Sequence, residues 1–239
     1  IMDVDIYYCN VTFIFGTVLG SFFNVVGDRL ANDESIIKPR SHCPHCRHKL
    51  GPSELIPIVS YLIQGGKCKH CHKKIPVIHP IYEALCGFMF ALTYYVFKFT
   101  PNFWITLTLL SVILIIFVSD IEYMIILDEV IAVAAIVIII LELIFFGLEY
   151  TADKIIAGIL AFVTMYVIKL IGDKLFKRES MGGGDIKLMF LFSLYEQAAA
   201  NVSRIRKFLF FYFIKIVSDC RIIQVPACFP RSLRKSYQE

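Results

Sequence analysis

Charge is scarce in this sequence: only 18% of its 239 residues are Asp, Glu, Lys or Arg, and 57% are hydrophobic. An ordinary soluble domain is nearer a quarter charged and about half apolar. A chain of this size could not bury so much apolar side chain in water. The abundance of aliphatic residues excludes a disordered chain, and the length excludes a small disulfide-stapled secreted protein. The composition therefore predicts a membrane protein.

The N-terminus lacks basic residues, and no segment shows the apolar–polar alternation of a strand. A signal peptide opens on a basic segment, whereas this chain opens with Asp3 and Asp5. We therefore expect the first apolar stretch to remain as a membrane helix. A spanning helix needs about 20 apolar residues. Five such segments are predicted, with a sixth that begins well: 6–27, 82–97, 103–119, 129–148, 154–172 and 185–194. The predicted fold is all-α, a polytopic helical membrane protein with about six transmembrane helices.

Residues 28–80 differ in composition from the rest of the chain. They hold four of the eight cysteines, six of the nine prolines and all six histidines, together with nine basic residues. Because cytoplasmic loops are enriched in Lys and Arg, we expect a multi-pass protein of the cell membrane with its N-terminus outside and this insert in the cytosol. Counting helices from there places Asp120 and Asp185 at the cytosolic face. We expect four parts: a first transmembrane helix (1–27), a cytosolic insert (28–80), a transmembrane core (81–194) and an atypical polar or interfacial tail (195–239). The short aromatic run at 208–214 in this tail predicts a membrane-surface segment.

Two CxxC pairs predict a structural zinc site in the insert. They are separated by 21 residues, a pattern that suits tetrahedral thiolate ligation, and four protein ligands leave no open position for catalysis. The predicted ligands are Cys43, Cys46, Cys68 and Cys71. The alternatives are two reduced surface pairs, two disulfides if the topology is inverted, or replacement of one cysteine by His45 or His70. The other histidines are expected at the solvated surface: His42, His48, His72 and His79.

The membrane segments contain no serine, histidine or cysteine set suited to hydrolysis, but they do contain carboxylates. Asp185 follows Gly182, Gly183 and Gly184, which allow a close approach of backbone or substrate; the alternative is a flexible connector with Asp185 as a helix cap. If Asp120 and Asp185 share a site, they hold one proton between them. Such a pair can activate water and assist a peptide carbonyl without a metal. Glu142 is the deepest carboxylate, and we expect a hydrogen bond in the bundle interior.

At these residues the chain resembles a known family, the type IV prepilin leader peptidases, which are GxGD-type intramembrane aspartyl proteases. It is most similar to the short Gram-positive version that serves competence pseudopilins. Six segments carry the resemblance in the right order: Gly20–Val25 with Arg29, Pro39–Cys46, Ile56–Leu62, Pro80–Glu83, Asp120–Glu122 and Gly182–Lys187.

The resemblance implies an aspartic endopeptidase that cleaves the leader peptide of prepilin-like precursors after a glycine, at the cytosolic membrane face. It implies Asp120 and Asp185 as the catalytic pair and Gly182–Gly184 as a substrate loop. Many members also methylate the new N-terminus with S-adenosylmethionine, and this activity rests on the resemblance alone because the sequence has no glycine-rich nucleotide fold. The expected partners are prepilin or pseudopilin precursors and the lipid bilayer, with no nucleic acid.

Several alternatives stay open at this stage. Gly16 and Gly20 form a GxxxG pattern that serves helix packing or a substrate or methyl-transfer role. Leu127 stands where the family usually has proline, and the resemblance ends near Leu194, so the tail is divergent or disrupted. Two other functions compete: a proton- or cation-coupled transporter, and an inactive zinc-containing membrane interaction protein.

Overall fold

The computed structural model describes residues 2–176 and 182–196, and these residues form helices without a named strand. The elements are α1 (Met2–Ala31), η1 (Pro52–Glu54), α2 (Val59–Ile63), α3 (Ile78–Phe97), α4 (Pro101–Tyr123), α5 (Asp128–Phe146), α6 (Leu148–Phe176) and α7 (Gly183–Glu196). The all-α prediction is confirmed. Five helices are long and apolar enough to cross a membrane, namely α1, α3, α4, α5 and α6, so the chain is a multi-pass membrane protein. The sixth predicted segment is α7, with 14 residues; most of the tail, including the aromatic run, lies outside the described residues.

Glycines bring α1 and α3 unusually close together. A Cβ atom on Gly16 would lie 2.7 Å from Cβ of Phe90, and one on Gly20 would lie 2.7 Å from Cβ of Cys86. From the opposite helix, a Cβ on Gly87 would lie 2.6 Å from Cγ2 of Thr17. Real Cβ atoms do not approach so closely, so only glycine fits at these three positions. The packing role predicted for the GxxxG pattern is confirmed, as membrane helices associate through small residues.

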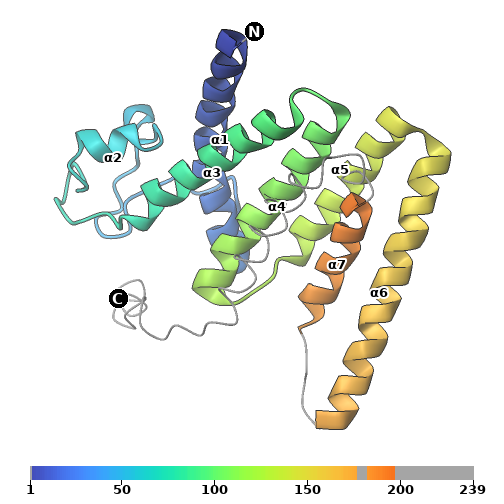
Figure 1. Ribbon diagram of the computed structural model, residues 1–239. Helices are drawn as coiled ribbons and strands as arrows, with labels where there is room; N and C mark the ends of the chain where they lie inside the picture. Colours follow the sequence, from blue (N-terminus) through green and yellow to red (C-terminus); the bar gives the residue numbers. More distant parts are fainter. Residues whose placement is uncertain (1, 177–181, 197–239) are drawn as a thin grey trace.

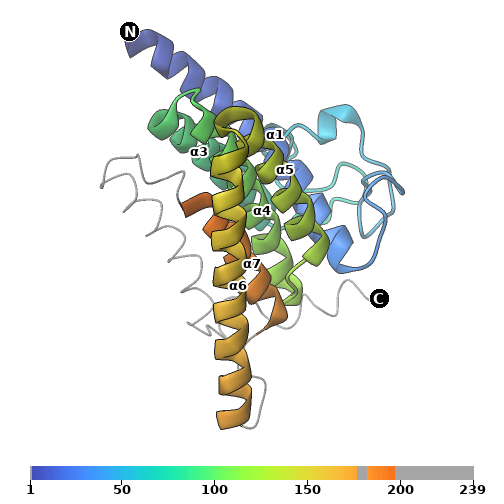
Figure 2. The ribbon, with the colours of Figure 1, turned by 90° about the vertical axis from the view of Figure 1, so that its right-hand side faces the viewer.

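Helix α4 runs through the centre of the bundle. One of its sides packs on α1 and α3 around Phe90, Leu110 and Leu114, and the other packs on α5 and α7 around Leu109 and Leu191. Figure 1 shows α7 between α5 and α6, with α6 along the edge of the molecule; Figure 2, turned by 90°, shows the same stack of helices from the side. The two carboxylate-bearing helices α4 and α7 are therefore neighbours, although 59 residues of chain separate their described ends.

The hairpin between α5 and α6 holds a buried ion pair. Lys154 Nζ donates to Glu142 Oε1 at 2.6 Å, and both side chains are fully buried. The bundle-interior hydrogen bond predicted for Glu142 is confirmed. Helix α6 begins at Leu148, six residues before the predicted segment. The charge of Lys154 favours a membrane boundary at that residue. Inside the bundle this charge is neutralised by Glu142, so the helix can extend past it.

Candidate active site and metal centre

Three helix ends meet at one end of the bundle. Asp120 lies in the last turn of α4, which ends where Met124 adopts a left-handed conformation and donates its backbone N–H to the Asp120 carbonyl at 3.0 Å. A four-residue link, residues 124–127, then leads into α5. Asp185 is the third residue of α7, and its acidic side chain suits the positive end of the helix dipole. Both aspartates are half-buried.

The first turn of α7 packs directly on the link between α4 and α5. A Cβ on Gly184 would lie 2.6 Å from Cβ of Ile126 and 2.8 Å from its Cγ2. Gly184 is therefore needed for the close approach that brings Asp185 next to the segment following Asp120. The other two predicted glycines differ: Gly183 has open space around its Cα, and a Cβ on Gly182 would lie 3.3 Å from Asp185 Oδ2. The carboxylate of Asp185 thus lies near an exposed backbone segment without side chains.

An ion pair reinforces this contact. Lys187 Nζ of α7 lies 2.5 Å from Asp128 Oδ2, the first residue of α5. The sequence gives no signal for this pair, because the two residues are neighbours only through the packing of helices that are distant along the chain. At the far end of α7, Thr106 donates to the Tyr195 hydroxyl at 3.3 Å and joins α7 to the beginning of α4.

The C-terminal end of α1 and the N-terminal end of α3 add a polar network that the sequence did not reveal. Tyr123, one turn beyond Asp120, donates to Asp28 at 2.5 Å and accepts from Asn32 at 2.8 Å. His79 bonds to Asn24 at 2.7 Å. The prediction of His79 as a solvated surface residue is wrong: its ring is half-buried between α1 and α3. The sequence feature that could have indicated this burial is the position of His79 at the start of α3, where a polar side chain faces a neighbouring helix.

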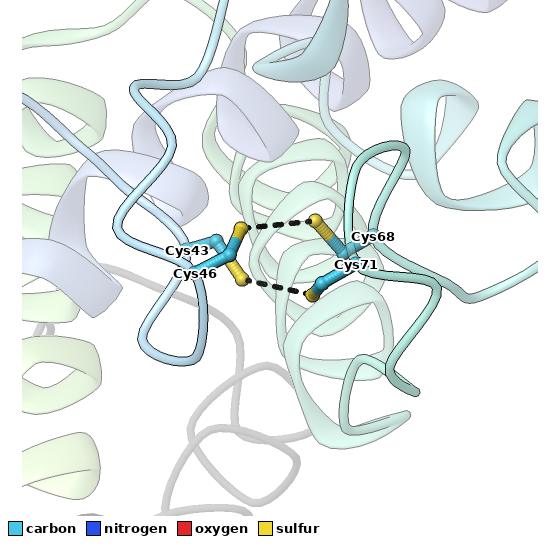
Figure 3. A group of neighbouring side chains, drawn as sticks. All are labelled: Cys43, Cys46, Cys68 and Cys71. Carbon is cyan, nitrogen blue, oxygen red and sulfur yellow. Dashed lines mark hydrogen bonds between the residues drawn. The ribbon is translucent and has the colours of Figure 1, made fainter.

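The structure brings the four predicted cysteine ligands together, as Figure 3 shows. Their sulfur atoms all lie within 4.8 Å of one another, with Cys43 Sγ 3.8 Å from Cys71 Sγ and Cys46 Sγ 3.9 Å from Cys68 Sγ. A zinc ion with Zn–S bonds of about 2.3 Å in tetrahedral geometry separates its sulfurs by about 3.8 Å. The cluster therefore fits a zinc-ribbon insert, and it is the one group of metal-ligating side chains found within the described residues.

Each CxxC pair is built on the same local turn. Cys43 N–H donates to the His48 carbonyl at 2.9 Å, and Cys68 N–H donates to the Lys73 carbonyl at 2.9 Å. Backbone N–H groups of Cys71 and His70 point at the Cys68 sulfur and lower the pKa of its thiol to about 7. The rings of His70 and His48 are in tilted contact, with centroids 3.7 Å apart, and neither His45 nor His70 belongs to the four-sulfur group.

The comparisons with known proteins agree with this architecture. The family model for the bacterial peptidase A24 N-terminal domain matches residues 14–97, and the model for the type IV leader peptidase family matches residues 107–219. The second match extends beyond Leu194. No solved structure gives a significant match to the chain.

Curated relatives from several bacteria carry the name prepilin leader peptidase/N-methyltransferase, and three of them illustrate the similarity. The protein of Bacillus subtilis is 36% identical over 190 residues, which is 75% of this chain and 70% of the relative. The protein of Vibrio cholerae is 32% identical, over 73% of this chain and 72% of the relative. That of Myxococcus xanthus is 31% identical, and the match covers 77% of this chain but 54% of the relative. With both halves of the chain matched by the family's models, the protein belongs to the type IV leader peptidase family.

Proposed function

We propose that this protein is an intramembrane aspartic endopeptidase that removes the leader peptide of prepilin-like precursors, with Asp120 and Asp185 as its catalytic pair. The observation that carries the proposal is the packing of Gly184 on Ile126, which seats the helix bearing Asp185 against the segment that follows Asp120. The relatives' shared name supplies the substrate class. The family matches give no support to the transporter alternative.

The geometry of α4 and α7 supports a shared site. The two helices run in opposite directions, and the hydrogen bond between Thr106 and Tyr195 joins them at one end. At 1.5 Å of rise per residue, Asp120 lies about 21 Å along α4 from this bond, and Asp185 lies about 15 Å along α7 from it. The two aspartates are therefore within about 6 Å of the same level in the bundle, roughly one helical turn.

The proposed chemistry uses the two carboxyl groups and one proton. The ionised aspartate takes a proton from a water molecule, which attacks the carbonyl carbon of the scissile peptide. The protonated aspartate donates a hydrogen bond and then its proton to the carbonyl oxygen. Collapse of the tetrahedral intermediate breaks the C–N bond. The amine leaves with the proton held by the first carboxyl group, and the second carboxylate takes back one hydroxyl proton of the intermediate as the carbonyl re-forms. The exposed backbone at Gly182 and Gly183 leaves room for an extended substrate segment next to Asp185.

We further propose that the insert and the catalytic pair face the cytosol, with cleavage after a glycine at that membrane surface. The excess of Lys and Arg in residues 28–80 supports this orientation. The catalytic core is assigned to residues 81–194 and the metal module to residues 28–80. Zinc is proposed at Cys43, Cys46, Cys68 and Cys71 as a structural ion that holds the two turns together. Methylation of the new N-terminus, with S-adenosylmethionine as donor, is supported by the relatives' names.

The test is cleavage of a prepilin precursor in membranes that contain the full chain. Asp120→Asn and Asp185→Asn keep the size and shape of the side chains, so we expect both proteins to accumulate normally and to lose cleavage, measured by the mass of the released mature pilin. Glu149→Gln is the matched control, because Glu149 is an exposed acid at the start of α6. Full cleavage by either aspartate variant would refute the catalytic pair.

A further inference from the structure

The insert contains an uncharged apolar run that the metal site does not use. Residues 55–66 hold no Asp, Glu, Lys or Arg, and they lie between Glu54 and Lys67. A run of 10–14 apolar residues is too short to span a bilayer and is typical of a buried core segment or of a segment at the membrane interface. The solvent exposure of the side chains in residues 55–66 decides between these two alternatives.

The run is not a core segment. Helix α2, at its centre, has no buried residue, and Leu62 and Ile63 are 70% and 80% exposed. Ile56 and Val59 are about half exposed, at 48% and 47%. Single exposed apolar residues are common in any protein, but a contiguous group of large ones marks a surface that binds a partner or a membrane. We refer to Leu55, Ile56, Val59, Leu62 and Ile63 as the α2 patch.

The α2 patch is held next to the point where α3 enters the membrane. The backbone N–H of Ile58, at the start of α2, donates to Glu83 Oε2 of α3 at 2.7 Å. Ile58 has a positive φ of 59° with ψ of −51°, which is unfavourable for a β-branched residue, so the hydrogen bond from its N–H fixes a conformation that the chain would otherwise avoid. The start of α3 continues the apolar surface, with Val77 and Ile81 58% and 57% exposed.

The position of the insert agrees with the placement of the α2 patch next to α3. In Figure 1 and Figure 2, which differ by a rotation about the vertical axis, α2 lies to one side of the helix bundle.

The charges around the run fit the surface of an anionic bilayer. Residues 28–80 contain nine basic and four acidic residues. Part of the excess lines an open cleft of about 630 Å³ between the end of α1 and the first cysteine turn, with a single acid, Glu34, in its lining; the basic side chains there are Lys38, Arg40, Arg47 and Lys49. Basic residues near the cytoplasmic leaflet attract its anionic headgroups, and apolar side chains beside them enter the acyl boundary.

From these observations we infer that the α2 patch lies in the membrane interface and anchors the cysteine module to the bilayer. The partner is the lipid itself, with acyl chains against Leu62 and Ile63 and anionic headgroups against the basic residues of the insert. The module is then a surface-bound part of the membrane domain, and α2 is a monotopic element between two spanning helices.

The chain's single tryptophan makes a direct test available. Trp104→Phe removes the native fluorophore, and Leu62→Trp in that background places a new one in the α2 patch. Glu34→Trp is the control, since Glu34 is an exposed polar residue of the same insert. Each full-length protein is reconstituted in vesicles of phosphatidylglycerol and phosphatidylcholine, with and without bromine on the acyl chains. Bromine quenches tryptophan only at short range, so the readout reports contact with lipid and does not depend on peptidase activity.

We expect bromine to quench most of the emission of the Leu62→Trp protein and to leave the Glu34→Trp protein nearly unchanged. Ile63→Trp is a second reporter in the same patch and should behave like Leu62→Trp. Equal and weak quenching at Leu62, Ile63 and Glu34 would overturn the inference. If emission at Leu62 shifts to the blue only when a prepilin precursor is added, the patch binds protein, and the lipid assignment is wrong.

Discussion

Lys187 and Asp128 form an ion pair, with 2.5 Å between Nζ and Oδ2, that joins the second turn of α7 to the first residue of α5. Each of these residues is close in sequence to one of the two proposed catalytic aspartates. Lys187 lies two residues after Asp185, and Asp128 begins α5, which a four-residue link joins to the helix that bears Asp120. The pair is thus a clamp beside the proposed site, formed by groups that do not need to touch the substrate.

We expect Asp128→Ala to reduce prepilin cleavage only modestly. The two side chains are 59% and 46% exposed, and exposed pairs contribute about 0–1 kcal/mol, which corresponds to a rate change of about fivefold at most. Lys187→Ala should give a similar loss, and the exchange Asp128→Lys with Lys187→Asp should recover part of it. Initial cleavage rates in membranes provide the measurement. A loss as complete as that of Asp120→Asn would instead place Asp128 in the catalytic pair.

Gly184→Ala should abolish most of the cleavage, whereas Gly183→Ala should not. The added Cβ at position 184 would lie 2.6 Å from Cβ of Ile126, so α7 must move away from the link after Asp120. At position 183 a Cβ meets nothing within 4 Å. Alanine is favoured over glycine in a helix by about 1 kcal/mol, so a weaker helix cannot account for the loss. Rates of both variants at equal protein level are compared, and equal activity would contradict the proposed role of the contact.

Purified protein should contain about one zinc ion per chain, as expected for a closed tetrahedral site. Cys43→Ser or Cys68→Ser should lower the zinc content and make residues 28–80 sensitive to protease, because the ion joins the two cysteine turns. Cys9→Ser is the control, since Cys9 lies in α1 and outside the four-sulfur group. Elemental analysis by mass spectrometry gives the metal identity and amount. Zinc retained in full by both ligand variants would exclude the assigned site.

Removal of one member of the buried pair Glu142–Lys154 should destabilise the bundle strongly. Breaking such a pair leaves an uncompensated buried charge and costs about 3–5 kcal/mol, whereas replacing both members by apolar residues is often nearly neutral. We therefore expect Lys154→Met to lower the free energy of unfolding in detergent, and Glu142→Leu with Lys154→Met to restore most of the loss. A double variant as unstable as the single one would show that the charges do not interact as described.

The sequence predicted the elements whose signals are local. Apolar length located the five spanning helices, and Pro101 together with the polar residues before it located the hairpin between α3 and α4. The CxxC spacing located the four sulfur atoms, because each pair lies on a short turn whose geometry depends on few residues. The proposed roles of Asp120 and Asp185 stay predictions that the cleavage assay tests.

Contacts between distant segments were beyond the reach of the sequence. The pairs Asp128–Lys187 and Tyr123–Asp28 depend on which helices pack together, and no periodic pattern records that choice. The start of α6 was placed too late for the same reason, since Lys154 marks a membrane boundary unless its partner Glu142 is known. Glu142 itself was expected to find a partner inside the bundle, but the sequence did not identify Lys154 as that partner.

The close glycine packing of α1 on α3 also bears on how long the chain between these two helices can be. The two helices are held together by their own contacts, and the bond between Asn24 and His79 closes the connection at 2.7 Å. A longer chain that starts and ends at this base can still close the loop, because doubling the length of a flexible loop costs only about 0.6 kcal/mol. The packing of the first two helices therefore tolerates insertions in the module between them, in evolution and in protein engineering.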